Sequence, residues 1–242
     1  MKYKKFFRLT LWEFEEIWRL PTLELIIGIA VFFGLSSTTA PSSLPLRQIV
    51  DVEGNMFRLT LFEMFIIAVL FARSVAGNIE KREILNLFTY PVKRVSILAS
   101  KFIVNVSLIF IIFASVIVAR GLLSQLEPWN TLMLIVLFIL FLETLFFSTL
   151  SLLLSVIAKK TWATILLVII FFFTITSFMP QLEPPLKYAI PTYGAQAMFS
   201  YLALGSHDYT FEDFTVALSS MVIMSIIFLL VSFIHFKRMQ VD

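Results

Sequence analysis

Long apolar runs separated by short polar segments form most of this chain of 242 residues. Six runs are long enough to cross a bilayer, because the hydrocarbon core requires about 20 residues of helix. A segment surrounded by lipid must satisfy its own backbone hydrogen bonds, which favours helices. The pattern predicts an all-α, polytopic integral membrane protein in which residues 1–242 form a single transmembrane domain. The six predicted transmembrane helices are 23–40, 59–76, 97–119, 131–157, 161–179 and 214–236.

Prolines and charged residues mark the ends of several spans. Pro180 follows the fifth span, and proline stops a helix because it lacks a backbone N–H and clashes with the preceding turn. Lys159 and Lys160 separate the fourth span from the fifth. A connection this short predicts that the two spans form an antiparallel hairpin.

Residues 4–20 precede the first span and have an amphipathic pattern. At helical spacing, Phe7, Leu11, Phe14 and Trp18 form one stripe, and charged residues lie largely opposite. A helix with aromatic residues on one face and basic residues on the other is typical of the membrane interface. We therefore expect an N-terminal interfacial amphipathic helix, which either has a role of its own or only anchors the first span.

The segment 180–213, between the fifth and sixth spans, is rich in proline and contains several acidic residues. Its middle part, from Pro191 to Leu204, is apolar and long enough for roughly two to three helical turns. It is too short to cross a bilayer. We expect a re-entrant or interfacial helix on the outer face.

Lysine and arginine are distributed unequally between the two sides that the six spans define. Of 19 such residues, only four lie on the outer side, namely Arg47, Arg58, Arg120 and Lys187. All others, including Lys101 at the end of the third span, lie on the side of the two termini. The positive-inside rule places this side in the cytoplasm, and an even number of spans agrees with it. We expect the Lys101 side chain to extend to this cytoplasmic surface.

The composition indicates a protein dissolved in lipid. Hydrophobic residues make up 59% of the chain and charged residues 14%, and the mean hydropathy is +0.93. Soluble proteins contain about 25% charged residues, so a soluble domain is excluded. The net charge of +3 comes from basic residues that flank apolar runs, which predicts the bilayer of a cell or inner membrane as partner, and no nucleic acid. Cysteine is absent, which excludes disulfides and thiolate metal sites.

The loop 77–96, between the second and third spans, is the largest internal segment on the predicted cytoplasmic side. It begins with charged residues and continues with an apolar patch. Pro91 then keeps Tyr90 out of helical geometry, which predicts a short helix that ends there. Such a helix is either a docking surface for a cytosolic partner or a connector at the membrane interface.

This loop also carries a resemblance to a known family. Its leucines, its Pro-Val-x-Arg sequence and the lysine of the third span resemble the signature after the second span in permeases of the type-2 ABC exporter family. Glu83-Ile84 stands where those permeases usually have Gly-Thr. The N-terminal helix, the six spans and the outer helical segment agree with the same family. The matching residues are Glu80, Leu85, Leu87, Pro91, Val92, Arg94 and Lys101.

The resemblance implies that the loop is a coupling helix that docks on a separate ABC ATP-binding subunit. That partner would bind ATP and Mg²⁺, and a second permease copy or a paralogue would complete the transporter. The chain lacks the phosphate-binding pattern G-x-x-x-x-G-K-[ST], so we expect no cofactor and no enzymatic activity of its own. The implied coupling residues are Glu80, Lys81, Arg82, Glu83, Leu85, Leu87, Phe88, Pro91 and Arg94.

Two acidic residues inside the predicted spans are candidates for an intramembrane polar site. Glu143 lies near the centre of the fourth span, where a charge costs about 2.5–3.5 kcal/mol on insertion scales. It is either a pathway residue that contacts substrate or exchanges protons, or a structural residue bonded to a base or a hydroxyl. Glu63 lies about one turn inside the second span, where we expect it to pair with Arg58 or to reach the outer surface.

Other classes of membrane protein fit less well. Glu15-Glu16 resembles part of a membrane metalloprotease motif, but the spacing is short, and His207 and His235 are not placed to complete a metal site. A membrane serine protease would need a Gly-x-Ser and an intramembrane histidine. The alternative that stays open is a non-transporting membrane scaffold or an ATP-independent channel built from similar helices.

Overall fold

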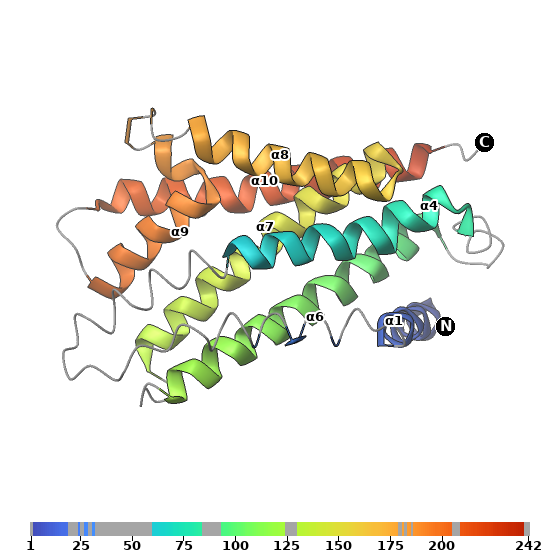
Figure 1. Cartoon of the computed structure of the whole chain (residues 1–242), viewed down its shortest axis with the longest axis horizontal. Coiled ribbons are helices and arrows are strands. Elements are labelled where there is room, and N and C mark those ends of the chain that lie inside the picture. Colours follow the sequence, from blue (N-terminus) through green and yellow to red (C-terminus); the bar gives the residue numbers. More distant parts are fainter. Residues whose placement is uncertain are drawn as a thin grey trace.

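The computed structural model describes residues 2–18, 60–83, 93–123, 130–178, 186–204 and 209–239, with a few single positions between these ranges. All regular elements in these ranges are helices, which confirms the all-α prediction for this part of the chain (Figure 1). The helix Thr60–Glu80 is called the second-span helix below; it ends in η1 (Ala72–Gly77) and α4 (Asn78–Glu80). The other helices are α1 (Lys2–Trp18), α6 (Arg94–Leu123), α7 (Thr131–Ala158), α8 (Thr161–Phe178), η3 (Leu186–Ala189), α9 (Pro191–Phe199), η4 (Ser200–Leu204) and α10 (Phe211–Arg238).

Four of the described helices are long and apolar enough to cross a membrane. They are the second-span helix, α6, α7 and α10, and they correspond to the predicted second, third, fourth and sixth spans. The predicted fifth span corresponds to α8, a shorter apolar helix. The predicted first span, 23–40, lies almost entirely outside the described residues. The structure therefore supports an integral membrane protein, and the number of six spans stays a prediction.

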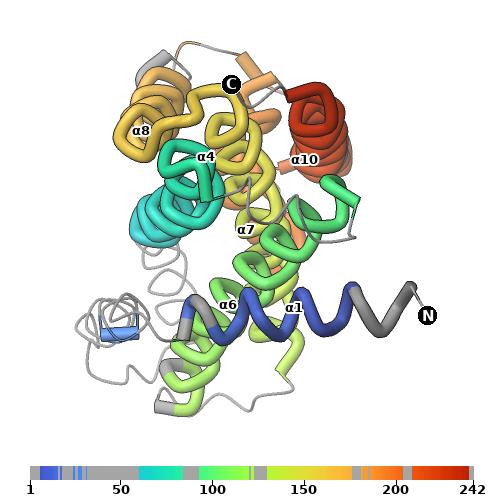
Figure 2. Tube along the Cα trace, turned by 90° about the vertical axis from the view of Figure 1, so that its right-hand side faces the viewer, coloured from blue at the N-terminus to red at the C-terminus, as the bar shows by residue number. Residues whose placement is uncertain are grey.

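The long helices run side by side, with α7 in the middle of the bundle (Figures 1 and 2). α7 packs against α6, α8, α10 and η1. Large apolar side chains fill the interior, and Phe71, Phe113 and Phe147 are among those that are fully buried. Because α7 is surrounded by other helices, its polar residues can lie inside the protein rather than against lipid.

The two ends of the bundle contain different segments. One end contains α1, the end of the second-span helix, the start of α6, the α7–α8 turn and the last turn of α10 (Figure 1, right-hand side). The opposite end contains η3, α9 and the start of α10. The first group is the set of segments that the lysine and arginine count assigns to the cytoplasm. The first end is thus the predicted cytoplasmic one, and its orientation in the membrane stays a prediction.

α1 lies across the bundle rather than along it (Figure 2). It packs against α6. In the predicted aromatic stripe, Phe7, Leu11 and Phe14 are exposed by 64%, 48% and 43%, whereas Glu13 and Ile17 are buried. A crosswise helix with an exposed aromatic face has the geometry expected at a membrane interface, and its contact with lipid stays a prediction.

The turn between α7 and α8 depends on an unusual backbone conformation at Lys159. This residue caps the C-terminus of α7 with φ at 56°, in the left-handed region, and its N–H donates to Ser155 O at 3.2 Å. The chain then enters α8 at Thr161, and α7 and α8 pack against each other. The predicted helical hairpin is therefore confirmed.

Replacing Lys159 by glycine is expected to raise the free energy of unfolding by about 1 kcal/mol, because glycine adopts the left-handed region without the steric cost of a β-carbon. Lys159 is exposed, so the change removes little packing. Thermal unfolding of the purified protein in detergent measures the effect. Lys160→Gly, at the adjacent exposed position, is the matched control. Equal or lower stability for Lys159→Gly would show that its side chain contributes more than the backbone conformation costs.

Candidate functional site

The first implied coupling residues form an exposed, charged turn at the predicted cytoplasmic end (Figure 1). Lys81 N–H donates to Gly77 O at 2.9 Å, and Arg82 then takes a φ of 60°, which ends the helix. The exposed residues of this turn are Glu80, Lys81, Arg82 and Glu83. The roles of Leu85, Leu87, Phe88 and Pro91 stay predictions, because these residues lie outside the described ranges.

Glu80 also has a partner within the chain. Its Oε2 accepts hydrogen bonds from the N–H and from the hydroxyl of Thr161, both at 2.9 Å. Thr161 is the first residue of α8, so Glu80 brings a carboxylate to the positive end of that helix. A β-carbon on Gly77 would lie 3.3 Å from the Thr161 hydroxyl, so the two helix ends are in close contact. Sequence reasoning assigned Glu80 to docking alone and missed this bond.

Arg94, the last implied coupling residue, is attached to another helix as well. Its guanidinium donates to Met239 O at 2.9 Å. Arg94 begins α6, and Met239 caps the C-terminus of α10. The segment 84–92 is therefore flanked by a bond to α8 on one side and a bond to α10 on the other.

The second candidate site is a pair of carboxyls inside the bundle. Glu63, on the second-span helix, is 0% exposed, and Glu143, on α7, is 2% exposed. The Thr60 hydroxyl lies 3.0 Å from Glu143 Oε2, and the Thr144 hydroxyl contacts Glu63 Oε1. Each of the two helices thus contributes one carboxyl and one threonine to a shared polar cluster.

This cluster corrects one expectation and sharpens another. The expectation that Glu63 reaches the outer surface is wrong, because its side chain is completely buried and in contact with α7. Arg58, its other expected partner, lies outside the described residues. For Glu143, a hydroxyl was one of the expected partners, and Thr60 provides it from a different span.

The second-span helix and α7 run in the same direction. Glu63 near the start of the second-span helix contacts Thr144 of α7, and Glu80 at its end is bonded to Thr161, the first residue of α8 just beyond the end of α7. The two parallel helices therefore connect the carboxyl pair with the charged turn. Between these two points, small residues of both helices are fully buried, which permits close packing. They are Ala68, Ala72, Ala76, Ser148, Ser151 and Ser155.

One face of α7 carries a row of buried hydroxyls. Thr144, Ser148, Ser151 and Ser155 follow one another at helical spacing, and each is 0% exposed. Within the described part of the chain, the three serine hydroxyls have no hydrogen-bond partner. A buried hydroxyl without a partner is costly, so these positions favour a water molecule or another small hydrogen-bonding group.

A buried ion pair joins α1 to α6. Lys101 Nζ lies 2.6 Å from Glu13 Oε2, and each side chain is 2% exposed. The Lys101 side chain thus extends toward α1 at the predicted cytoplasmic end, as expected, but it ends in this buried ion pair and is not exposed. The sequence did not predict a role for Glu13, because the amphipathic pattern of residues 4–20 indicated contact with the membrane interface and not with another helix.

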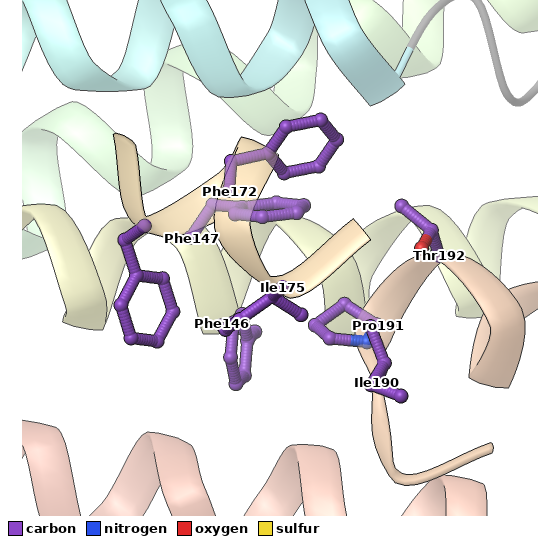
Figure 3. A pocket seen from close by; sticks show the side chains of 8 residues that line it. Phe146, Phe147, Phe172, Ile175, Ile190, Pro191 and Thr192 are labelled. Atoms are coloured by element: carbon purple, nitrogen blue, oxygen red, sulfur yellow. The ribbon is translucent and has the colours of Figure 1, made fainter. Parts of the chain in front are cut away.

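A small apolar pocket lies where α7, α8 and the start of α9 meet (Figure 3). It is lined by phenylalanines and Ile175 from α7 and α8, and by Ile190, Pro191 and Thr192. Its interior of about 10 Å³ holds no more than a single water. The pocket is too small for a cargo, and no cluster of metal-ligating side chains occurs among the described residues.

Long apolar helices that enclose a polar cluster define an α-helical integral membrane protein. Comparison with known families identifies its kind: the family described as ABC-2 family transporter protein matches residues 13–176, about two thirds of the chain. The chain therefore belongs to the ABC-2 transporter family and is a membrane-embedded permease. No individual curated protein matches it significantly.

The match confirms the resemblance that the loop suggests. The matched residues include the end of α1, the second-span helix, the loop, α6, α7 and most of α8. The charged turn and the carboxyl pair both lie within them.

Proposed function

We propose that this chain is the membrane-spanning subunit of an ATP-driven ABC transporter that works as an exporter. A separate ATP-binding subunit, which carries ATP and Mg²⁺, docks on the loop between the second-span helix and α6. Membership of the ABC-2 family supports a partner of this kind. The main structural support for docking at this loop is that both of its described flanks are hydrogen-bonded to other helices, through Glu80 and Arg94.

The bonds at the two flanks provide a mechanical connection between the partner and the spans. When the ATP-binding subunit moves the loop, the Glu80–Thr161 bonds move the start of α8, and the Arg94–Met239 bond moves the end of α10. α10 extends to the opposite end of the bundle, where it packs against α9 and η3. A displacement at the cytoplasmic end thereby reaches the outer end.

A second permease copy or a paralogue completes the transporter in this proposal. α8 has an exposed apolar face, on which Trp162, Leu166, Ile170 and Phe173 are exposed by 78%, 55%, 57% and 58%. Such a face is suited to lipid or to another span. We place the cargo path between two copies, because the pocket at the α7–α8–α9 junction has the size of a water molecule. Both termini are cytoplasmic in this arrangement, and α1 lies in the membrane interface.

Exchanging two charges in the exposed turn tests the docking site. The variant Lys81→Glu, Glu83→Lys reverses the local polarity without changing the net charge, and both side chains are exposed. The full chain is co-expressed with a candidate ABC ATP-binding subunit, and co-purification of the two is measured. We expect at least about tenfold less ATP-binding subunit to co-purify with the variant than with the wild-type chain. Like charges placed opposite each other at an interface cost several kcal/mol.

Two further variants make this test specific. Lys237→Glu is the matched control, because it reverses an exposed charge at the same end of the bundle but outside the loop. Glu80→Gln weakens the bond to Thr161; we expect it to keep the partner but to reduce the effect of the permease on the rate of ATP hydrolysis. If the wild-type chain does not co-purify with the ATP-binding subunit, a non-transporting scaffold or an ATP-independent channel describes the protein better.

A further inference from the structure

We propose that Glu63 and Glu143 form a proton-binding site inside the membrane, which exchanges its proton along the hydroxyl row of α7. The site is formed by the permease alone and does not require the ATP-binding subunit. It goes beyond the proposed function, because it places a titratable group between α7 and the second-span helix, which leads to the docking loop.

The contacts of Thr144 favour a proton on Glu63. A threonine hydroxyl has one proton to donate and two lone pairs that accept. Its Oγ1 has two oxygen neighbours to which it could donate, Leu140 O at 2.8 Å and Glu63 Oε1, and one proton serves only one of them. A proton on Glu63 allows both contacts to be hydrogen bonds, because Thr144 then donates to the carbonyl and accepts from the carboxyl.

Burial leads to the same conclusion. Glu63 Oε2 and Glu143 Oε1 are buried and have no hydrogen-bond partner within the described ranges. An ionised carboxylate in the interior of a membrane protein is stabilised only by a partner or by water. Two neighbouring carboxylates would in addition repel each other, and less strongly screened than in water. A bound proton removes this repulsion and leaves the pair with at most one charge.

Some titratable groups on the surrounding helices have partners of their own or lie at the outer end. On α6, Lys101 is paired with Glu13. On α10, Asp213 forms a capping box with Thr210 at the outer end, and on η4 the ring of Tyr201 stacks on Phe214. α8 contains no acidic, basic or tyrosine residue. The remaining groups on packed elements are Arg73, Glu80, Arg94, Arg120, Lys187, Tyr188, Tyr193, Glu212, His235, Lys237 and Arg238.

The hydroxyl row of α7 provides the exchange route. Ser148 follows Thr144 by one turn, and its side chain tilts back toward Thr144 because helical side chains point toward the N-terminus. Ser151 and Ser155 continue the row toward the α7–α8 turn. Successive residues on one helix face are about 5–6 Å apart, a gap that one water bridges. In the proposed route, such waters supply the partners that these serine hydroxyls lack.

Infrared spectroscopy of the full-length permease in lipid nanodiscs tests the site. Exposed carboxyls are ionised at neutral pH. A carbonyl-stretch band from protonated carboxyls at this pH therefore comes from buried acidic residues. We expect this band at neutral pH, a shift of the band in D₂O, and its loss in the double variant Glu63→Gln, Glu143→Gln. The exposed Glu183→Gln is the matched control and keeps the band. A wild-type spectrum without the band would overturn the proposal even if the double variant does not fold.

Two further measurements test the identity of the ligand and the route. Replacing choline by Na⁺ as the cation of the buffer salt, at constant pH, is expected to leave the protonated-carboxyl band unchanged. Loss of this band in Na⁺ would mean that the carboxyl pair binds a metal cation instead of a proton. The triple variant Ser148→Ala, Ser151→Ala, Ser155→Ala is expected to slow the D₂O shift several-fold relative to Ser115→Ala, an exposed hydroxyl on α6. Equal rates would overturn the route along α7.

Discussion

Replacing Lys101 by methionine is expected to lower the free energy of unfolding by about 3–5 kcal/mol, the usual cost of removing one partner of a buried ion pair. The ammonium of Lys101 lies 2.6 Å from Glu13 Oε2, and both side chains are 2% exposed. Methionine keeps most of the apolar stem of lysine, so the loss of charge outweighs the loss of volume. The carboxyl of Glu13 must then take up a proton, or α1 must separate from α6.

Chemical unfolding of the purified protein in detergent measures this effect, and a double variant separates charge from packing. Glu13→Gln combined with Lys101→Met removes both buried charges and is expected to recover most of the lost stability. Glu15→Gln, an exposed position on the same helix, is the matched control and is expected to change the stability by less than about 0.5 kcal/mol. If the double variant is as unstable as Lys101→Met, lysine stabilises the contact through packing and not through its charge.

Replacing Gly194 by alanine is expected to have the next largest effect, a destabilisation of about 1–3 kcal/mol from overpacking. An added β-carbon would lie 2.6 Å from Tyr188 O and 3.3 Å from Ala217 Cβ. The first of these atoms belongs to the backbone and cannot rotate away, so α9 must shift relative to η3 or α10. Gly194 thus permits the close approach of three segments at the predicted outer end.

Thermal unfolding in detergent checks this prediction, with Gly28→Ala as the matched control. Among the described residues, no heavy atom lies within 4 Å of a β-carbon built on Gly28, so we expect the control to unfold at or slightly above the wild-type temperature. If Gly194→Ala unfolds at the wild-type temperature, η3 and α9 can move apart at little cost.

The sequence predicts the long helices well, because the length of an apolar run is a local property. The predicted span 131–157 corresponds to α7, Thr131–Ala158, and the predicted span 214–236 lies within α10, Phe211–Arg238. The short turn at Lys159 and Lys160 likewise leaves few conformations other than a hairpin. The family signature in the loop is also local, and the family match agrees with it.

Contacts between helices are much harder to predict from the sequence. They depend on how each helix is rotated about its axis, and helices that are apolar on all sides give little information on this rotation. Glu13 and Lys101 are 88 positions apart, and Glu63 and Thr144 are 81 positions apart. Lys101 was expected to reach a membrane surface, Glu63 was expected to do the same or to pair with Arg58, and no expectation was made for Glu13. The structure instead buries both pairs, because a partner from another helix replaces the water.

The contacts near both ends of the second-span helix limit how this helix can move. Sliding it along the α7–α8 hairpin by one turn, about 5.4 Å, would break the contact of Glu63 with Thr144 and the bonds of Glu80 to Thr161 at the same time. A rotation of the second-span helix about the carboxyl pair keeps the bonds of Glu80 if the start of α8 moves with it. In the proposed transporter, a force applied at the loop would therefore rotate this helix together with the start of α8 rather than shift it along its own axis.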